Sequence, residues 1–182
     1  MDYTEKTISK EDKFRGRIVY MHVDKVRLPN GRESTREIVE HSGGVAIIPV
    51  DEDGNVYCVR QYRYAAGEHV LEVPAGKLNE GEDPLECAVR ELSEETGFSA
   101  DNFVSMGFFY PSIGYCREKI YIYLATGLHR GRAHLDEGEF LDVEKYPLDT
   151  LVRMVENNEL HDGKSIIAVL RARNYLKQQV IR

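Results

Sequence analysis

The segment from Asp83 to Gly97 constrains the fold of this chain more than any other feature. Its apolar residues recur at spacings of three and four: Leu85, Ala88, Val89 and Leu92. That spacing places them on one side of a helix. Asp83 can cap the first turn, Pro84 suits the first helical position, and Gly97 can end the last turn. We therefore predict a helix over residues 83–96 with one face packed against the rest of the chain.

The same segment carries three carboxylates that a helix would bring together. Glu91 and Glu95 are four residues apart, and Glu94 is three residues from Glu91. Like charges at these spacings destabilise an isolated helix. A divalent cation explains why they are tolerated, because Mg²⁺ prefers several oxygen ligands. Arg90 and Glu82 can then orient or neutralise the outer carboxylates.

The order of residues in this region resembles the Nudix box, which is a glycine, a glutamate, and then Arg-Glu-apolar-x-Glu-Glu-x-Gly-apolar. All of its defining positions are filled between residues 76 and 98, by Gly76, Glu82, Arg90, Glu91, Leu92, Glu94, Glu95, Gly97 and Phe98. The resemblance implies hydrolysis of a diphosphate linkage with Mg²⁺, or with Mn²⁺ as the alternative. It also implies a set of metal ligands: Glu91, Glu94, Glu95 and the backbone carbonyl of Ala75.

Two segments before the box resemble one group within this family. Residues 71–76, Leu-Glu-Val-Pro-Ala-Gly, are similar to the lead-in of ADP-ribose pyrophosphatases. Residues 60–63, Arg-Gln-Tyr-Arg, are similar to their Gln-aromatic-Arg strand, whose arginine contacts substrate phosphate. The resemblance implies cleavage of a nucleoside diphosphate sugar, with ADP-ribose as the expected substrate. The substrate-binding residues it implies are Arg36, Glu37, Arg63, Glu72, Gly114 and Glu118.

One segment departs from the pattern of these relatives. They carry Ser-Pro-Gly shortly after the box, whereas this chain has Pro111-Ser112-Ile113-Gly114. Proline and serine are exchanged in order, and Ile113 takes the proline position. This difference falls on the side of the pocket that would hold the second sugar. Glu118 occupies a position that is often acidic in the relatives.

The general base is predicted to lie outside the box. Relatives place it on an acidic loop before the C-terminal helices, and the matching loop here spans residues 136–139, Asp-Glu-Gly-Glu. Gly138 would let this loop close over substrate. We predict Glu137 as the base and Glu139 as a metal contact or second choice. Glu94 of the box is the competing base.

Other functions are consistent with parts of the sequence. A GDP-mannose or other sugar-nucleotide diphosphatase is the main alternative, because residues 162–165, Asp-Gly-Lys-Ser, resemble a segment of those enzymes as well. A non-catalytic nucleotide-sugar-binding module is a distant alternative, since such modules usually lose box carboxylates that this chain keeps. The net charge of −7 and the lack of a basic patch argue against a nucleic-acid substrate.

The remaining patterns predict an α+β fold, an α/β/α sandwich with a mixed β-sheet between helices. We expect strands near residues 17–23, 36–40, 43–50, 56–63, 103–110 and 119–125, and further helices at 148–157 and after 163. Residues 1–40 would form an N-terminal antiparallel β-hairpin extension around the Asn30-Gly31 turn. Residues 41–182 would form the Nudix hydrolase domain. By resemblance, the extension implies a homodimer.

Composition predicts a cytoplasmic protein without a membrane partner. No apolar run approaches the length needed to cross a bilayer, and the first residues are polar. The three cysteines are scattered and odd in number, which is typical of reduced thiols.

Overall fold

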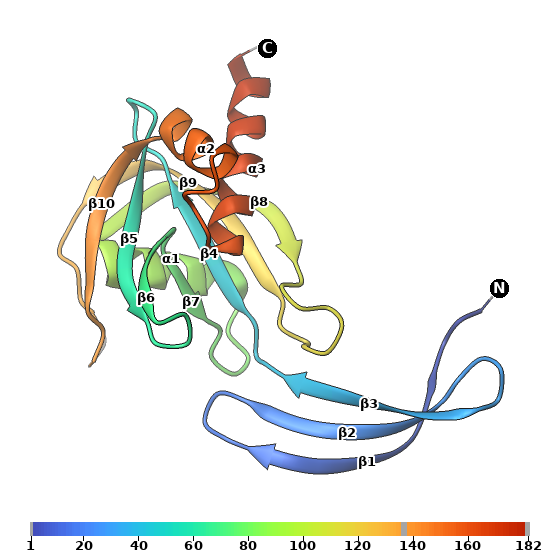
Figure 1. Ribbon diagram of the computed structural model, residues 1–182. Coiled ribbons are helices and arrows are strands. Elements are labelled where there is room, and N and C mark those ends of the chain that lie inside the picture. The colour runs from blue at the N-terminus through green and yellow to red at the C-terminus, as the bar shows by residue number, and fades with distance from the viewer. Residues whose placement is uncertain (1, 136–137, 181–182) are drawn as a thin grey trace. The chain divides into compact units, whose positions relative to one another are not determined.

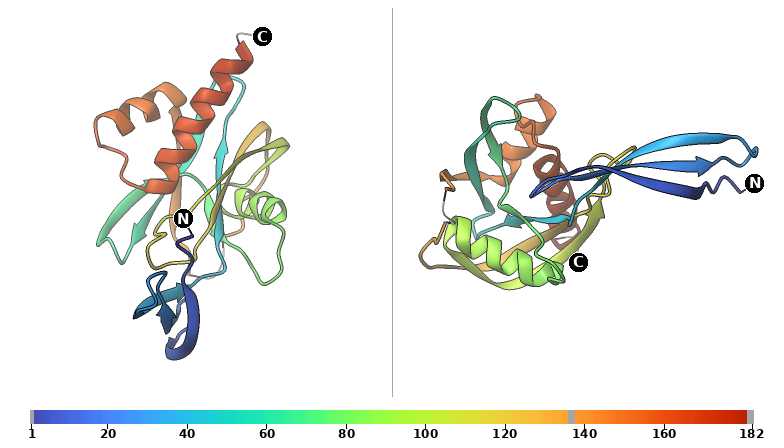
Figure 2. Two further views of the ribbon diagram at one scale, coloured as in Figure 1. Left: turned by 90° about the vertical axis from the view of Figure 1, so that its right-hand side faces the viewer. Right: turned by 90° about the horizontal axis from the view of Figure 1, so that it is seen from below.

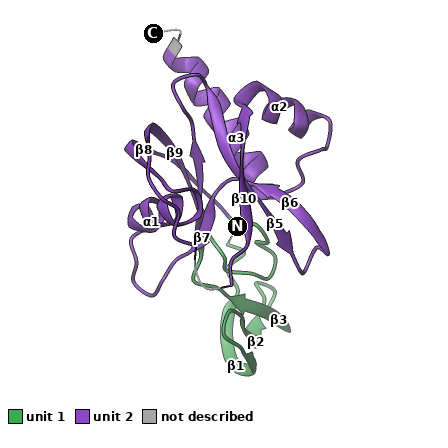
Figure 3. Ribbon diagram, turned by 90° about the vertical axis from the view of Figure 1, so that its left-hand side faces the viewer, with its two compact units in different colours: residues 1–43, 110–119 green, residues 44–109, 120–182 purple. Residues whose placement is uncertain are grey.

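The computed structural model describes residues 2–135 and 138–180. The chain divides into two compact units, which are coloured separately in Figure 3. Unit 1 comprises residues 1–43 and 110–119, and unit 2 comprises residues 44–109 and 120–182. Unit 1 therefore contains the N-terminal extension together with a segment that lies far from it in the sequence.

Unit 1 is built on a three-stranded antiparallel sheet, in the order β1 (Lys6–Arg15), β2 (Tyr20–Arg27) and β3 (Glu33–Glu40). The predicted hairpin joins β2 and β3, and Gly31 adopts the left-handed conformation (φ 83°) that its turn requires. Strand β1 was not predicted. All of its residues are exposed, so its sequence lacks the alternation that marks a half-buried strand.

Segment 110–119 is joined to this sheet through β3. The backbone of Val39 accepts a hydrogen bond from Arg117 N (2.9 Å) and donates one to Tyr115 O (2.8 Å). Inside unit 1, the buried ring of His22 contacts Asp24 Oδ1 (2.8 Å) and Glu40 Oε1 (3.1 Å). The two Val39 hydrogen bonds join segment 110–119, which was predicted to border the substrate, to the N-terminal strands.

Unit 2 contains two sheets (Figure 1). The first has the order β7 (Ala75–Lys77), β4 (Gly44–Pro49), β9 (Ile120–Arg130) and β8 (Phe98–Phe109). It is mixed, because β4 and β9 run parallel and its other pairs run antiparallel. The second sheet is antiparallel, in the order β10 (Leu141–Pro147), β5 (Asn55–Arg63) and β6 (Glu68–Glu72).

Helices pack on both faces of the mixed sheet. They are α1 (Pro84–Thr96), α2 (Leu148–Glu156) and α3 (Gly163–Val180). Val45 and Ile47 of β4 point toward the core that includes α1, and Ala46 and Ile48 point toward the core that includes α2 and α3. Figure 2 shows α1 and α3 on opposite sides of β4. The predicted α+β fold with a mixed sheet between helices is confirmed.

Strands β6, β7 and β10 were not predicted, and β8 begins at Phe98 rather than near residue 103. β7 has three residues, which is too short for a periodic pattern. Strand β10 is mostly exposed or half-buried, so its apolar residues do not alternate clearly with polar ones. β7 and β10 are held by pairing with strands distant in sequence, β4 and β5, which no local pattern reveals, whereas β6 forms a hairpin with β5.

Helix α1 follows its predicted boundaries closely. Asp83 Oδ1 accepts a hydrogen bond from Leu85 N (2.8 Å), and Gly97 ends the helix in the left-handed conformation with φ 73°. The Gly97 N–H donates to Ser93 O (2.9 Å). Among the described residues, no helix is long and apolar enough to span a membrane.

Candidate functional site

The carboxylates of α1 lie against the backbone of β7. Glu95 is 4% exposed, and its Oε2 accepts a hydrogen bond from Ala75 N (3.0 Å). Beside it, the Glu91 carboxylate packs over Gly76, where an added Cβ would lie 1.8 Å from Glu91 Cδ. A side chain at residue 76 would therefore displace Glu91. This explains physically why a glycine stands at the start of the box.

Burial makes these two carboxylates hard to ionise. Burial, together with the neighbouring charges of Glu91 and Glu139, raises the pKa of Glu95 to about 8, against the hydrogen bond from Ala75. The pKa of Glu91 is raised by burial and by Glu94 and Glu139, although Arg90 opposes this shift. A buried and a half-buried carboxylate that repel each other form a place where a cation is favoured.

Arg90 spans the outer carboxylates of the helix. Its Nε donates to Glu82 Oε1 (2.9 Å), and its Nη1 donates to Glu91 Oε1 (2.7 Å) and Glu94 Oε2 (2.8 Å). Glu82 also accepts from Asn79 N (2.8 Å), and its pKa is lowered to about 2, chiefly by Arg90. Arg90 thus contacts the carboxylates of the helix, and Glu82 holds Arg90 from its other side.

The donor set fits a divalent cation. Glu91 and Glu95 supply partly uncompensated buried oxygens, and the Ala75–Gly76 backbone passes directly beside them. In the described part of the chain, no three acidic, histidine or cysteine side chains already form a cluster that could hold a metal ion. Glu91 and Glu94 are instead paired with Arg90. Hard oxygen ligands and unbalanced negative charge are the features that Mg²⁺-type cations require.

Arg63 at the end of β5 lies near these carboxylates. Its charge lowers the pKa of Glu95, and its guanidinium is paired with the buried Glu72 at the end of β6. Lys164, at the start of α3, also pairs with Glu72. The sequence did not predict a role for Lys164, because its partner Glu72 is 92 residues away.

The acidic loop is described only in part. Glu137, the predicted base, lies outside the described residues, as does Asp136. Glu139 is described, and its charge raises the pKa of both Glu91 and Glu95. The loop therefore contributes at least one carboxylate to the surroundings of the box.

The other predicted substrate contacts lie in unit 1. Arg36 on β3 donates through Nε to Glu5 Oε2 (2.9 Å), and Glu37 is its neighbour on the strand. Glu118 pairs with His41 (3.6 Å). Gly114 lies in the turn that follows Pro111, where an added Cβ would meet nothing within 4 Å. Unit 2 thus contains the box residues together with Arg63 and Glu72. The other predicted substrate contacts, Arg36, Glu37, Gly114 and Glu118, belong to unit 1.

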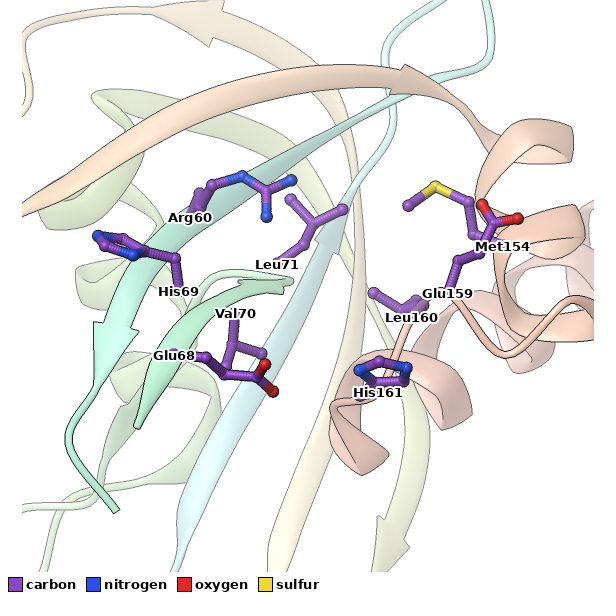
Figure 4. Close-up of a pocket in the computed structure, with 9 residues that line it drawn as sticks. All are labelled: Arg60, Glu68, His69, Val70, Leu71, Met154, Glu159, Leu160 and His161. Atoms are coloured by element: carbon purple, nitrogen blue, oxygen red, sulfur yellow. The ribbon is translucent and has the colours of Figure 1, made fainter. Parts of the chain in front are cut away.

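Unit 2 also has a hollow of about 190 Å³ on another side of β5 (Figure 4). Strands β5 and β6 line it with Arg60, Glu68 and His69, and the segment after α2 lines it with His161. Arg60 is held there by Glu144 of β10 (2.6 Å). Because residues three apart on a strand point to opposite faces of the sheet, the side chains of Arg60 and Arg63 have different neighbours. No box carboxylate lines this hollow.

We expect Glu95→Gln to stabilise the metal-free protein increasingly as pH rises from about pH 5 to about pH 8. The raised pKa means that folded Glu95 binds a proton the unfolded chain releases, so parental stability falls across this window. The glutamine variant does not titrate, and its advantage should reach at least about 1 kcal/mol. Urea unfolding in EDTA at several pH values measures this. A difference that is constant with pH would contradict it.

Comparison with known proteins places this arrangement in a family. The NUDIX domain model matches residues 40–168, and the nucleoside diphosphate sugar hydrolase N-terminal domain model matches residues 5–39. An ADP-ribose pyrophosphatase of Bacillus subtilis (strain 168) is 40% identical over 91% of this chain and 90% of its own length. A methanol dehydrogenase activator of Bacillus methanolicus is 42% identical over 92% and 91%.

A solved structure gives the same result for the fold. A crystal structure of an ADP compounds hydrolase superposes with a TM-score of 0.85, at 24% identity, over 96% of this chain and 95% of that one. The family model covers the carboxylates of α1 and the backbone beside them. The chain belongs to the Nudix hydrolase family.

Proposed function

We propose that this protein hydrolyses the diphosphate linkage of ADP-ribose, releasing AMP and ribose 5-phosphate, with Mg²⁺ as the metal. The observation that carries the proposal is the pair of carboxylates, the half-buried Glu91 and the buried Glu95, held against the Ala75–Gly76 backbone. Nudix hydrolases use divalent metals, and this pair suits one. The similarity to ADP-ribose pyrophosphatases and the N-terminal domain model support a nucleoside diphosphate sugar as substrate.

The reaction needs charge neutralisation more than covalent chemistry. Water adds to one phosphorus atom while the bridging P–O bond breaks, and the proton of the water ends on the released phosphates or solvent. A bound divalent metal would neutralise the diphosphate oxygens and activate the water. Glu91, Glu94, Glu95 and the Ala75 carbonyl would hold it. Arg63 would bind the diphosphate through planar donors.

The substrate proposal is tested by turnover with each candidate nucleotide and Mg²⁺. We expect ADP-ribose to give AMP and ribose 5-phosphate, and nucleoside triphosphates to react poorly. Glu95→Gln should lower kcat at least about 100-fold, because it removes a negative metal ligand. Chromatography identifies the products. Faster hydrolysis of GDP-mannose would leave the reaction type intact and replace ADP-ribose as the substrate.

The acidic loop is our proposed source of the base. We expect Glu137→Gln to lower kcat much more than it changes KM, because a base acts in the transition state. Arg63→Ala should raise KM more, because phosphate contacts exist before chemistry. Steady-state kinetics of both variants measures this split. Parental kcat in Glu137→Gln would move the base to Glu139, whose charge acts on Glu91 and Glu95, or to Glu94.

We also propose that the chain works as a homodimer through its N-terminal extension, residues 1–40. β1 is exposed along its whole length and bears apolar side chains, including Ile8 (43% exposed) and Phe14 (59% exposed). An edge strand of this kind is suited to pairing or packing with a second copy. Sedimentation equilibrium at micromolar concentration should give twice the chain mass. A fully active monomer would contradict the proposal.

A cytoplasmic setting is consistent with the cysteines. Cys58, Cys87 and Cys116 are all unpaired, and burial raises the pKa of Cys58 and of Cys87 to about 12. Such thiols are inert packing residues, as is usual in a reducing compartment.

A further inference from the structure

A network of ion pairs connects the start of α3 to Arg63. Arg63 donates through Nε to Glu72 Oε1 (2.6 Å) and through Nη2 to Glu72 Oε2 (2.7 Å). Glu72 is 1% exposed. Its Oε2 also accepts a hydrogen bond from Lys164 Nζ, and Lys164 lies 3.0 Å from Asp162 Oδ1. The buried carboxylate therefore joins two cations from different elements.

The α3 end of this network is hydrogen-bonded to the backbone. Asp162 Oδ2 accepts from Ser165 N (3.0 Å) and from the Ser165 hydroxyl (2.5 Å). The Ser165 oxygen in turn accepts from Val73 N (2.8 Å), the residue that follows Glu72. The first turn of α3 and the end of β6 are thus locked together at the point where Glu72 and Lys164 meet.

The Arg63 end of this network is exposed to solvent. The side chain of Arg63 is 44% exposed, whereas those of Glu72 and Lys164 are 2% and 14% exposed. Both carboxylate bonds use Nε and Nη2, and no hydrogen bond joins Nη1 to a described residue. The Nε–Nη2 edge of the guanidinium is therefore held by the buried Glu72, and the charge of Arg63 is close enough to Glu95 to act on it.

We infer that Glu72 and Lys164 are positioning residues that act through Arg63, fixing its guanidinium so that its outer edge can receive the diphosphate. This inference rests on the proposed function, and it replaces the substrate contact that the sequence assigned to Glu72. Two parallel hydrogen bonds set the plane of the guanidinium. The ion pair with Lys164 keeps the Glu72 carboxylate from moving over to Arg63. It also gives this buried negative charge a second positive partner. Preorganisation of this kind lowers the entropic cost of binding.

A double-mutant cycle separates positioning from direct contact. The probe is inorganic diphosphate, titrated calorimetrically in EDTA so that binding does not depend on a metal. We expect Glu72→Gln to weaken binding on the order of tenfold, and Lys164→Met to weaken it roughly threefold. In an Arg63→Ala background both changes should alter the dissociation constant by less than about twofold, because the residue they act through is absent.

The same strand offers a matched control. Glu144 makes an equivalent two-point pair with Arg60, through Nε (2.6 Å) and Nη2 (3.2 Å), on the opposite face of β5. Glu144→Gln should leave diphosphate binding unchanged. Lys164→Arg should restore most of the binding lost in Lys164→Met, and it keeps the test available if Glu72→Gln fails to fold. Urea unfolding of each variant shows whether that variant folds and how stable it is.

Two results would overturn the inference. Equal losses from Lys164→Met with and without Arg63 would mean that Lys164 contacts the diphosphate itself or acts only on stability. Parental binding by folded Glu72→Gln would mean that Arg63 needs no support. Failure of the proposed function gives a different pattern: ADP-ribose is not hydrolysed by the parent, while the diphosphate cycle still reports whether Glu72 acts through Arg63.

Discussion

The packing of α1 against β4 is the contact on which the site depends. Cys87, Ala88 and Leu92 are fully buried in the core that they share with Val45 and Ile47. Full burial of a side chain such as Leu92 contributes about 1.5–3 kcal/mol, which helps to offset the cost of burying carboxylates on the same helix. This packing also determines how the helix is turned about its axis. Glu91 and Glu95 consequently meet the backbone of β7.

The charges around this contact follow a common arrangement. Two arginines approach the box, and each is held by a carboxylate through two hydrogen bonds: Arg90 by Glu82, and Arg63 by Glu72. Arg90 contacts the carboxylates of the helix, whereas Arg63 extends from the other sheet. The buried negative charge is thereby balanced only in part, since the pKa of Glu91 and of Glu95 stays raised. The remaining imbalance favours a divalent cation.

Family membership identifies the type of reaction more closely than it identifies the substrate. Two relatives of nearly equal identity carry different names, one an ADP-ribose pyrophosphatase and the other a methanol dehydrogenase activator. The box is a local arrangement within unit 2. Pro111 and Ser112, whose order departs from that of the relatives, lie in segment 110–119. That segment belongs to unit 1 and is held by the backbone of Val39.

The sequence by itself determined α1, its caps and its row of carboxylates, because these depend on residues a few positions apart. Asp83, Gly97 and the Leu92 face are all local features, and the hairpin at Gly31 is another. Strand β1 and the short β7 escaped prediction, since an exposed strand and a three-residue strand carry no period. The pairing of Glu72 with both Arg63 and Lys164 was decided only by the tertiary structure. It joins residues 9 and 92 positions apart, and such a contact arises where the first turn of α3 meets the end of β6, which local sequence does not encode.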